Sequence, residues 1–364
     1  MMTNFMPDDH RYMAQALRLA EQGLYTTMPN PRVGCIIVKN NKVLGEGAHL
    51  KAGTPHAEIH ALAQAGEQAA GATAYVTLEP CSHHGKTPPC TEALIDAGVA
   101  KVVVAMEDPN PLVAGKGIAA LQAAGIAVNS GLMQQQAQAL NPGFISRMVN
   151  RRPYVRSKIA ASLDGKTALA NGVSQWITGA AARADVQHWR AQSCAILTGI
   201  GTILKDNPSL TVRNLPIERQ PMSVIVDSDL RIPLTAKILQ NPSVLIAFVS
   251  DPDKKANTLA ERGVSLLSIS DDEGNVCLNS LLSHLASNEV NEVMVEGGEL
   301  LNGSLMRLKM INELIIYYAP KLMGGDSKNM FAFSSLQTME DTIPINVTDI
   351  RMFGDDIRIL ARCG

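Results

Sequence analysis

Residues with the chemistry of a metal site lie within one short stretch of the chain. His56 is followed by Cys81 and, nine residues further on, by Cys90. One imidazole and two thiolates supply three tetrahedral ligands for zinc, and the open fourth position holds a water whose pKa the metal lowers to about 7. A lone histidine or cysteine is more often an ordinary core or surface residue. The combination nevertheless favours a catalytic zinc site over that alternative and over a closed structural site.

Glu58 is the predicted proton shuttle of this site. It lies two positions after His56 in a stretch with the pattern of a helix, and two helical positions rotate a side chain by about 200°. Glu58 therefore does not point the same way as His56, and general acid–base chemistry is a better use of its carboxyl group than metal ligation. The order His-x-Glu, Pro80-Cys81 and Cys90 matches the signature of zinc deaminases, except that eight residues separate the cysteines where the signature reads Cys-x-x-Cys.

Helix starts are predicted to position two of the three ligands. A capped apolar stretch, 57–65, predicts a helix with His56 in its first turn. A threonine and two prolines precede Cys90 and predict a second helix over 91–97. The helix dipole lowers the pKa of a thiol in that first turn, which favours the thiolate that a metal requires.

Strands and helices alternate through the first half, which indicates a layered α/β/α domain. Cys81 follows a predicted strand at its carboxyl end, where such sheets bind ligands. A turn at Asn40-Asn41 is typical of a hairpin, and Asn150-Arg151-Arg152-Pro153 indicates a domain boundary after residue 150. The expected strands are 33–38, 43–47, 72–78, 101–105 and 126–128, and the expected helices are 8–23, 57–65, 91–97, 117–124 and 133–149.

Composition predicts two compact domains. A chain of 364 residues is long for a single core. Hydrophobic residues at 46% with only 4% aromatic residues fit aliphatic α/β packing. No apolar run reaches the ~18 residues of a membrane span, and residues 1–10 lack a signal pattern, so we expect a cytoplasmic protein without membrane contact. Six scattered cysteines do not form the pattern of a secreted disulfide framework.

The charge balance favours a small-molecule substrate over a nucleic acid. Residues 1–150 carry 10 lysines and arginines against 11 aspartates and glutamates, and residues 151–364 carry 22 against 23. A deaminase of tRNA or DNA needs a positive surface to hold the phosphate backbone. Neither half is basic, although a local basic patch is compatible with a neutral total.

The second half has the pattern of another α/β domain. Gly297-Gly298, between a strand and a helix, is a place where backbone amides can approach a phosphate, although such a pair more often marks a tight turn. No Gly-x-Gly-x-x-Gly follows a strand, so an ordinary Rossmann dinucleotide site is not expected. The expected strands are 154–160, 195–198, 222–226, 244–248, 264–267, 290–295 and 314–318 with a strand-rich end at 347–360; helices are expected over 180–191 and from residue 300, and a glycine-containing turn over 199–202.

Several motifs, in family order, make the chain similar to the bifunctional deaminase and reductase family of riboflavin biosynthesis. They cover nearly the whole chain: Asn30-Pro31-Arg32-Val33-Gly34, Gly45-Glu46-Gly47-Ala48-His49, 80–90, Ser162-Leu163-Asp164-Gly165, Ser174-Gln175-Trp176-Ile177-Thr178, 206–213 and Val295-Glu296-Gly297-Gly298. The resemblance implies a cytidine-deaminase-like domain over 1–150, which uses zinc, and a dihydrofolate-reductase-like domain over 151–364, which uses NADPH. It also implies a homodimer formed through the reductase domain.

For the first domain the resemblance implies deamination of a phosphorylated diaminopyrimidine ribosylamine. Asn30, His49 and His83 would contact this substrate. By their residue types alone, Asn30 between prolines is more often a turn residue and His49 a surface residue. Lys86 would hold the substrate phosphate, with a solvated loop lysine as an equal alternative.

For the second domain the resemblance implies NADPH-dependent reduction of the ribosyl chain to the ribityl form. The implied substrate residues are Ser174, Arg190, Leu210, Arg213 and Glu296, and the implied cofactor residues are Ala160, Trp176, Thr202, Asp206, Ser228, Gly297, Gly298, Glu299, Leu300, Leu301 and Asn302. Two arginines fit the capture of a 5′-phosphate, although Arg190 on a helix could equally be a solvated residue. Lys158 and Asp164 are the candidates for the acid of the reduction.

Two other classes of function compete with this prediction. A nucleic-acid-editing zinc deaminase with an added domain is disfavoured by the neutral charge and by the long spacing from Cys81 to Cys90. A non-catalytic scaffold held by zinc is disfavoured because Glu58 would have no purpose there.

Overall fold

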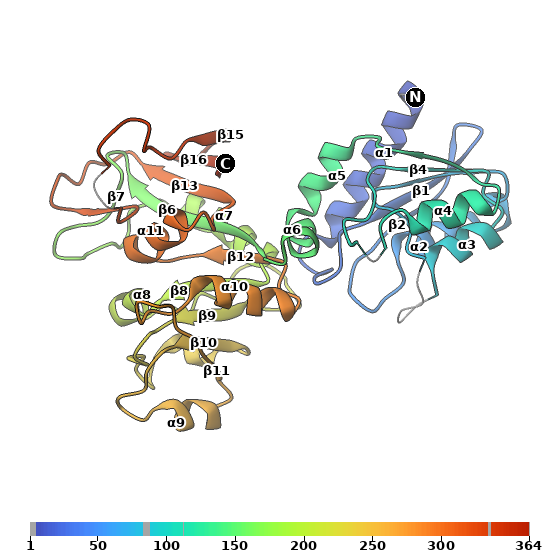
Figure 1. Cartoon of the computed structure of the whole chain (residues 1–364). Coiled ribbons are helices and arrows are strands. Elements are labelled where there is room, and N and C mark those ends of the chain that lie inside the picture. Colours follow the sequence, from blue (N-terminus) through green and yellow to red (C-terminus); the bar gives the residue numbers. More distant parts are fainter. Residues whose placement is uncertain (1–4, 83–87, 112, 334–335, 364) are drawn as a thin grey trace. The chain divides into compact units, whose positions relative to one another are not determined.

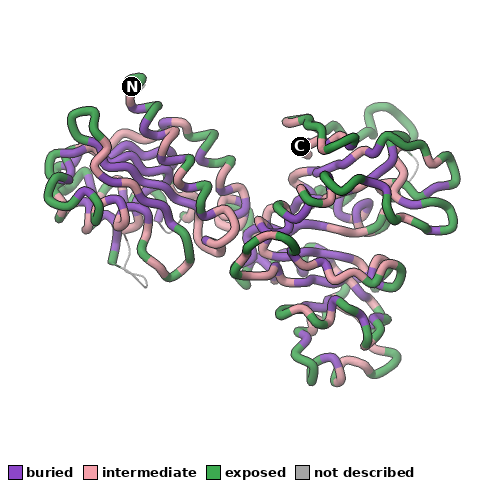
Figure 2. The backbone as a smooth tube through the Cα atoms, turned by 180° about the vertical axis from the view of Figure 1, so that it is seen from behind, coloured by how far each residue is buried: buried purple, intermediate pink, exposed green. Residues whose placement is uncertain are grey.

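The computed structural model describes residues 5–82, 88–111, 113–333 and 336–363. The chain divides into two compact units, Met1–Arg152 and Pro153–Gly364 (Figure 1). Each unit has its own buried aliphatic core, and the central strands of both are buried along most of their length (Figure 2). Within the described ranges, no helix combines the length and the apolar character that crossing a bilayer requires.

The first unit is built around a five-stranded sheet with the order β2-β1-β3-β4-β5. Strand β1 pairs antiparallel with β2 and β3, and β3, β4 and β5 are parallel. The predicted hairpin turn is confirmed, because Asn40 and Asn41 have φ values of 51° and 58°, as a tight turn between twisted strands requires. The strands are β1 (Gly34–Lys39), β2 (Lys42–Ala48), β3 (Thr73–Val76), β4 (Lys101–Val104) and β5 (Ala127–Ser130).

Helices cover both faces of this sheet, so the predicted α/β/α layering is confirmed. Gly34 faces α1 (Pro7–Ala20), because a Cβ there would lie 1.9 Å from the Ala16 carbonyl oxygen. Gly47 pairs with the residue after Gly34 and therefore points to the other face, against α2 (Ala57–Ala65). Short 3-10 turns follow α1 (Glu21–Gly23) and α2 (Gly66–Ala69). Helices α3 (Cys90–Asp96) and α4 (Lys116–Ala123) continue the layer of α2, and α5 (Gln134–Leu140) lies against α1.

The single helix predicted over 133–149 is wrong. The structure has two helices, α5 and α6 (Pro142–Asn150), with Asn141 between them. Pro142 has no N–H to donate and its ring would clash with the preceding turn, so it begins a helix rather than continuing one. The break frees the Asn141 amide to bond both backbone groups of Arg32, at 2.8 Å and 2.9 Å.

The second unit contains a nine-stranded sheet with the order β11-β10-β9-β8-β12-β6-β13-β16-β15. The first seven strands in that order are parallel, and β16 and β15 form an antiparallel hairpin at one edge. The strands are β6 (Tyr154–Ser162), β8 (Ala195–Gly199), β9 (Met222–Val226), β10 (Val244–Phe248), β11 (Ser265–Ser268), β12 (Glu292–Val295), β13 (Glu313–Ala319), β15 (Ile345–Phe353) and β16 (Asp356–Cys363). Strands β7 (Lys166–Ala168) and β14 (Lys328–Asn329) form a separate pair.

Alternate residues of the buried strands contribute to two cores, one on each face of the large sheet. In β8, Leu197 belongs to the core under α10 (Leu278–Ser287) and α11 (Glu299–Arg307). Its neighbour Ile196 belongs to the core under α7 (Ala180–Gln192), α8 (Ile200–Asp206), the 3-10 turn Lys237–Gln240 and α9 (Ala256–Glu261). This period of two confirms a second α/β domain.

The chain leaves two neighbouring strands of this sheet toward opposite faces. Helix α8 follows β8 onto one face, and α11 follows β12 onto the other. In open α/β sheets such a switch point leaves a crevice at the carboxyl ends of the strands. The turn predicted over 199–202 is wrong, because α8 already begins at Ile200 with Gly199 as its N-cap.

Candidate functional site

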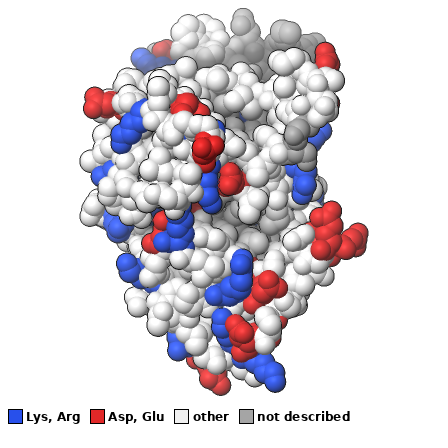
Figure 3. All heavy atoms as spheres, turned by 90° about the vertical axis from the view of Figure 1, so that its left-hand side faces the viewer, with Lys and Arg blue, Asp and Glu red and all other residues white. Residues whose placement is uncertain are grey.

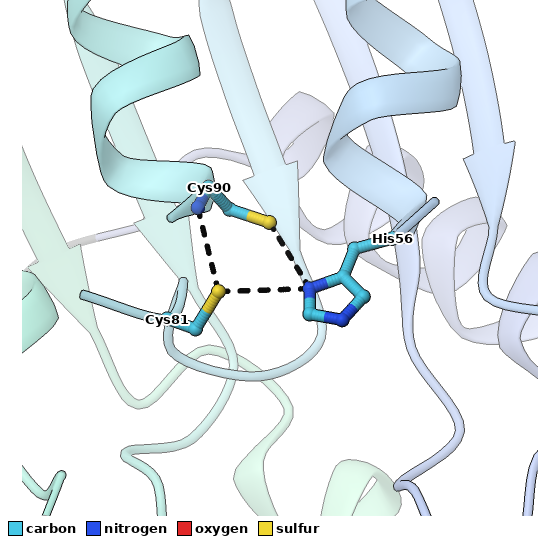
Figure 4. Close-up of side chains that lie close together, drawn as sticks. All are labelled: His56, Cys81 and Cys90. Atoms are coloured by element: carbon cyan, nitrogen blue, oxygen red, sulfur yellow. Dashed lines mark hydrogen bonds between the residues drawn. The ribbon is translucent and has the colours of Figure 1, made fainter. Parts of the chain in front are cut away.

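His56, Cys81 and Cys90 converge at one end of the first sheet (Figure 4). The His56 Nδ1 atom lies 3.2 Å from the Cys90 Sγ atom and 3.6 Å from the Cys81 Sγ atom. Zinc at its usual distances from nitrogen and sulfur in a tetrahedral site separates such atoms by about 3.5 Å. The three side chains therefore fit zinc, and Nδ1 is the imidazole atom that faces both sulfur atoms.

Close contact between α2 and β2 positions His56, which is the N-cap residue of α2. A Cβ on Gly47 would lie 2.0 Å from the Ala57 carbonyl oxygen, and a Cβ on Gly45 would lie 2.0 Å from the Ala61 carbonyl oxygen. Only glycine allows two backbones to approach this closely. These two glycines of the Gly45–His49 motif therefore act through packing, by bringing the start of α2 down onto the sheet.

Backbone hydrogen bonds hold the two cysteines together. The Cys90 N–H points at the Cys81 Sγ atom at 3.4 Å, and the Thr91 N–H donates to the Cys81 carbonyl oxygen at 3.2 Å. Just before Cys81, the buried Glu79 carboxylate accepts N–H groups from Asp108 and Gly115 at 3.0 Å, and from two further residues at the start of α4. Sequence reasoning missed this role of Glu79, because its partners lie about thirty or more positions away.

A hydrogen bond between the Cys81 and Cys90 side chains shifts the pKa values of the two thiols in opposite directions. A hydrogen bond from the Cys90 side chain lowers the pKa of Cys81 to about 4, and the same bond together with burial raises the pKa of Cys90. A hydrogen bond with Cys81 raises the pKa of His56. A metal ion takes the place of the protons that the three groups share, so binding releases protons.

Glu58 is buried next to this cluster, with only 3% of its surface exposed. Burial raises the pKa of its carboxyl group to about 7, and its side chain interacts with that of Cys90. A carboxyl group with this pKa can both accept and donate a proton near neutral pH. Glu58 is thus held in the state that acid–base chemistry requires.

Asn30 and His49 lie beside the cluster. The Asn30 Nδ2 atom is 3.1 Å from the His49 Nε2 atom, and the His49 and His56 rings are 5.1 Å apart in an edge-to-face arrangement. The His49 Nδ1 atom is 3.3 Å from the Pro55 carbonyl oxygen, which selects the tautomer protonated at Nδ1. The alternative that His49 is a surface residue is wrong, since it is 2% exposed. The predicted residues His83 and Lys86 lie outside the described residues.

A second site occupies the crevice at the switch point of the large sheet. A cavity of about 1700 Å³ opens there, which is larger than the usual pocket for a single small ligand. Its wall includes Gly297 and Gly298 before α11, and Gly199 before α8. The predicted reductase residues that line it are Ala160, Ser174, Trp176, Arg190, Thr202, Asp206, Leu210, Arg213, Ser228, Glu296, Gly297, Gly298, Glu299, Leu300 and Leu301.

Two predicted candidates do not line the cavity. Asn302 is buried behind its wall, where its side chain bonds the Ser157 hydroxyl and the Gly297 carbonyl oxygen. The Asp164 carboxylate accepts backbone N–H groups from Met323 and Gly324 and so holds two loops together. A hydrogen bond from the Ser162 hydroxyl, together with these backbone bonds, lowers the pKa of the Asp164 carboxyl group to about 2.

A buried charge cluster lies at the inner wall of the cavity. Arg190 donates to both carboxylate oxygens of Glu296, at 2.6 Å and 3.1 Å, and to the Thr211 carbonyl oxygen at 2.9 Å. The alternative that Arg190 is a solvated helix residue is therefore wrong. The Lys158 Nζ atom lies 4.0 Å from the Glu296 Oε2 atom, and burial lowers the pKa of Lys158. Burial alone would raise the pKa of Glu296, but the two cations hold it below its usual value.

Among the described residues on the face that Figure 3 displays, positive and negative side chains are mixed. Lysines and arginines are interspersed there with aspartates and glutamates. The chain as a whole has a formal net charge of −2. A small-molecule substrate agrees with this distribution.

Two family models match the chain, one in each unit. Residues 6–106 match the cytidine and deoxycytidylate deaminase zinc-binding region, and residues 153–358 match the RibD C-terminal domain. The riboflavin biosynthesis protein RibD of Escherichia coli K12 is 46% identical over 361 residues, covering 96% of this chain and 98% of the relative. The protein of the same name from Haemophilus influenzae is 45% identical and covers 98% of each chain.

Solved structures resemble the whole chain as well. Form 1 of Acinetobacter baumannii RibD has a TM-score of 0.92 at 48% identity, covering 98% of this chain and 99% of that one. A Thermotoga maritima structure has a TM-score of 0.88 at 32% identity with the same coverage. It is described as a diaminohydroxyphosphoribosylaminopyrimidine deaminase and 5-amino-6-(5-phosphoribosylamino)uracil reductase.

Proposed function

This chain belongs to the RibD family of riboflavin biosynthesis proteins, a family of bifunctional deaminases and reductases, and we propose which of its residues carry each reaction. The first reaction is the hydrolytic deamination of 2,5-diamino-6-(5-phosphoribosylamino)pyrimidin-4(3H)-one. The second is the NADPH-dependent reduction of the ribosyl chain of 5-amino-6-(5-phosphoribosylamino)uracil to the ribityl form. We assign the deaminase to residues 1–150 and the reductase to residues 151–364.

The deaminase proposal depends on one observation, the buried Glu58 beside the convergent atoms of His56, Cys81 and Cys90. Zinc held by these three residues supplies a Lewis acid that lowers the pKa of a water at its open position. Glu58 accepts the proton of the attacking water and delivers it to the leaving ammonia. Burial, which raises the pKa of its carboxyl group, favours Glu58 as the residue that carries this proton.

Asn30 and His49 are proposed to hold the pyrimidine ring against this site. The hydrogen bond between their side chains orients both residues before the substrate binds. Burial lowers the pKa of His49, which keeps the ring neutral and its tautomer constant. His83 and Lys86 remain proposed substrate contacts by resemblance.

The reductase proposal depends on the cavity at the switch point of the large sheet. NADPH supplies the hydride that reduces the ribosyl carbon. The cavity fits this cofactor because its volume exceeds that of one small ligand and because a Cβ on Gly298, the N-cap of α11, would meet only open space. The pyrophosphate would approach the N–H groups at this helix start.

Lys158 is proposed to donate the proton of the reduction. Lys158 and Glu296 both line the cavity, with the Lys158 Nζ atom 4.0 Å from the Glu296 carboxylate, and burial lowers the pKa of Lys158 toward the range of an efficient general acid. Arg190 donates to both oxygens of Glu296 and to the Thr211 carbonyl oxygen, so its proposed role is to orient Glu296. Arg213, which lines the cavity and is exposed, is the better candidate for the 5′-phosphate.

We also propose a cytoplasmic homodimer that forms through the reductase unit. Strand β15 is the edge of the nine-stranded sheet and exposes a row of apolar side chains. Ile345, Val347, Ile350 and Met352 are 44% to 62% exposed. An edge strand with this character is a site of self-association unless it is covered.

Two matched variants test the division of labour. With the diaminopyrimidine substrate, wild-type protein should release ammonia and oxidise NADPH. Glu58→Gln should stop ammonia release yet oxidise NADPH when supplied with the deaminated intermediate, and Glu296→Gln should show the reverse. If the wild type releases ammonia but never oxidises NADPH, the reductase assignment is wrong; if Glu58→Gln still releases ammonia, the proposed shuttle is wrong.

A further inference from the structure

The segment that carries Asn30 is a loop of turns rather than a helix or strand. It begins at Leu24, after the 3-10 turn Glu21–Gly23, and ends at Arg32, two residues before β1. A loop loses conformational entropy when it is fixed, and this weakens substrate binding unless bonds within the protein have fixed the loop beforehand. The bonds that hold this loop therefore determine how well Asn30 can bind a substrate.

Arg32 closes this loop with its side chain. Its guanidinium group donates to the Leu24 carbonyl oxygen at 3.3 Å, eight positions back along the chain, and to the Leu140 carbonyl oxygen at 2.6 Å. Leu140 is the last residue of α5, where carbonyl groups lack helical partners and carry partial negative charge. One cation, only 2% exposed, thus joins both ends of the loop to the end of a helix.

The backbone of Arg32 is fixed as well. The Asn141 side chain accepts the Arg32 N–H at 2.8 Å and donates to the Arg32 carbonyl oxygen at 2.9 Å, although the two residues are 109 positions apart. Asn141 is buried at the break between α5 and α6, so it has little freedom to move. Together, the bonds of Arg32 to Leu24, Leu140 and Asn141 form what we call the Arg32 clamp.

The closed loop packs against His49, the residue that bonds Asn30. The His49 N–H donates to the carbonyl oxygen of Val33, the residue after Arg32, at 2.9 Å. Before the other end of the loop, a Cβ on Gly23 would lie 2.6 Å from the His49 carbonyl oxygen, so the chain is in close contact with the same residue there. With both ends held at His49, the Asn30 Nδ2 atom lies 3.1 Å from the His49 Nε2 atom.

The Arg32 clamp and the metal ligands lie on different layers of the unit. Leu140 ends α5, which packs against α1 on one face of the sheet. His56 and Cys90 lie at the starts of α2 and α3, which pack together on the other face. Loss of the clamp should therefore loosen the loop that carries Asn30 and leave the zinc ligands in place.

We propose that Arg32 is a positioning residue of the deaminase, because its clamp fixes the loop in advance and lets Asn30 meet the pyrimidine ring with little further loss of entropy. The inference rests on the proposed function, since it takes Asn30 as a substrate contact. Arg32 itself is buried and acts only through Asn30.

Steady-state ammonia release by the full-length zinc-loaded protein tests the proposal, with zinc content and melting temperature measured on each preparation. Arg32→Met removes the donors and keeps an unbranched side chain of similar length. It should raise KM for the diaminopyrimidine substrate about 10-fold, the effect of losing one well-placed hydrogen bond, with kcat within about threefold and zinc content unchanged. Arg32→Lys, which keeps the positive charge but not the planar fork of donors, should show a smaller rise in KM.

A double-mutant cycle separates positioning from general stability. Asn30→Ala alone should raise KM at least as much as Arg32→Met does. The double variant should have a KM within about threefold of that of Asn30→Ala, because a residue that acts through Asn30 then has nothing left to position. Tyr75→Phe is the matched control: it removes the bond from a buried hydroxyl to the Asp9 carboxylate of α1, at 2.7 Å, and should lower the melting temperature without changing KM.

The contrary outcomes separate the positioning role of Arg32 from the substrate contact of Asn30. An unchanged KM in Arg32→Met beside a raised KM in Asn30→Ala would overturn the positioning role and leave the substrate contact in place. The same holds for multiplied effects in the double variant, for an equal rise in KM in Tyr75→Phe, and for zinc loss in both Arg32 variants, which would make the arginine a support of the whole unit. If Arg32→Met alone loses zinc, a wild-type KM in Arg32→Lys would overturn it too. An unchanged KM in Asn30→Ala would refute the proposed substrate contact itself.

Discussion

Replacing Gly47 by alanine should remove the metal site without any change to a metal ligand. The new Cβ would lie 2.0 Å from the Ala57 carbonyl oxygen and 2.8 Å from the Ala61 backbone nitrogen, where ordinary contacts are 3.4 Å or longer. Backbone atoms cannot rotate away as a flexible side chain does. The first turn of α2 must therefore move by about 1 Å or more, and His56 moves with it.

The expected loss follows from the narrow tolerance of metal sites. Metal–ligand distances are held to within about 0.2 Å, and a displacement of about 1 Å costs on the order of 100-fold in rate. We expect Gly47→Ala to bind much less than one zinc per chain and to lose ammonia release by about 100-fold or more. NADPH oxidation with the deaminated intermediate should stay within about twofold of the wild type, because the reductase unit has its own core.

The assay combines zinc content by atomic emission, ammonia release and NADPH oxidation on the same preparations. Gly34→Ala is the matched control, since its Cβ would lie 1.9 Å from the Ala16 carbonyl oxygen of α1 on the opposite face of the sheet. It should lower the melting temperature yet retain zinc. Full zinc content in Gly47→Ala, or an equal loss of zinc in Gly34→Ala, would refute the argument that α2 contact positions His56.

Three further predictions follow from the two sites. With Lys158 as the proposed acid, NADPH oxidation should fall as pH rises through its lowered pKa, giving an alkaline limb below the usual lysine value of 10.5 that Lys158→Arg removes; a rate that is flat up to that pH would count against Lys158. Removal of zinc by a strong chelator should abolish ammonia release and spare NADPH oxidation with the deaminated intermediate, and a parallel loss of both activities would contradict two independent sites. Ile350→Lys should dissociate the proposed dimer in sedimentation velocity, whereas an unchanged sedimentation coefficient would place any dimer contact elsewhere than β15.

Sequence patterns predicted the elements that carry the three candidate metal ligands, because that information is local. A capped helix begins after His56, a strand ends before Cys81, and two prolines precede Cys90 at the start of the next helix. Each local signal predicts the element next to one of the three side chains. The structure confirms the corresponding helices and strand and brings the three side chains together. Nothing in the spacing identified which imidazole nitrogen faces the thiols, because that depends on the approach of α2 to β2.

Two wrong predictions also have local causes. The apolar pattern over 133–149 predicts one helix, but Pro142 interrupts it, so the signal for the break is present in the chain. The turn predicted over 199–202 is the first part of α8, where Gly201 is tolerated near the helix start.

The amino-acid sequence by itself determined the residue types, their order and the elements that carry them, and these were sufficient to indicate zinc, a proton shuttle and two α/β domains. Only the tertiary structure decided which distant residues meet in the reductase unit. Lys158 lies on β6, Arg190 on α7 and Glu296 directly after β12, and Arg190 and Glu296 are 106 positions apart. Patterns along the chain indicate which residues favour a helix or strand and which are buried. The strand order β8-β12-β6 depends instead on how all the buried strands pack together, and no local stretch of sequence encodes that order.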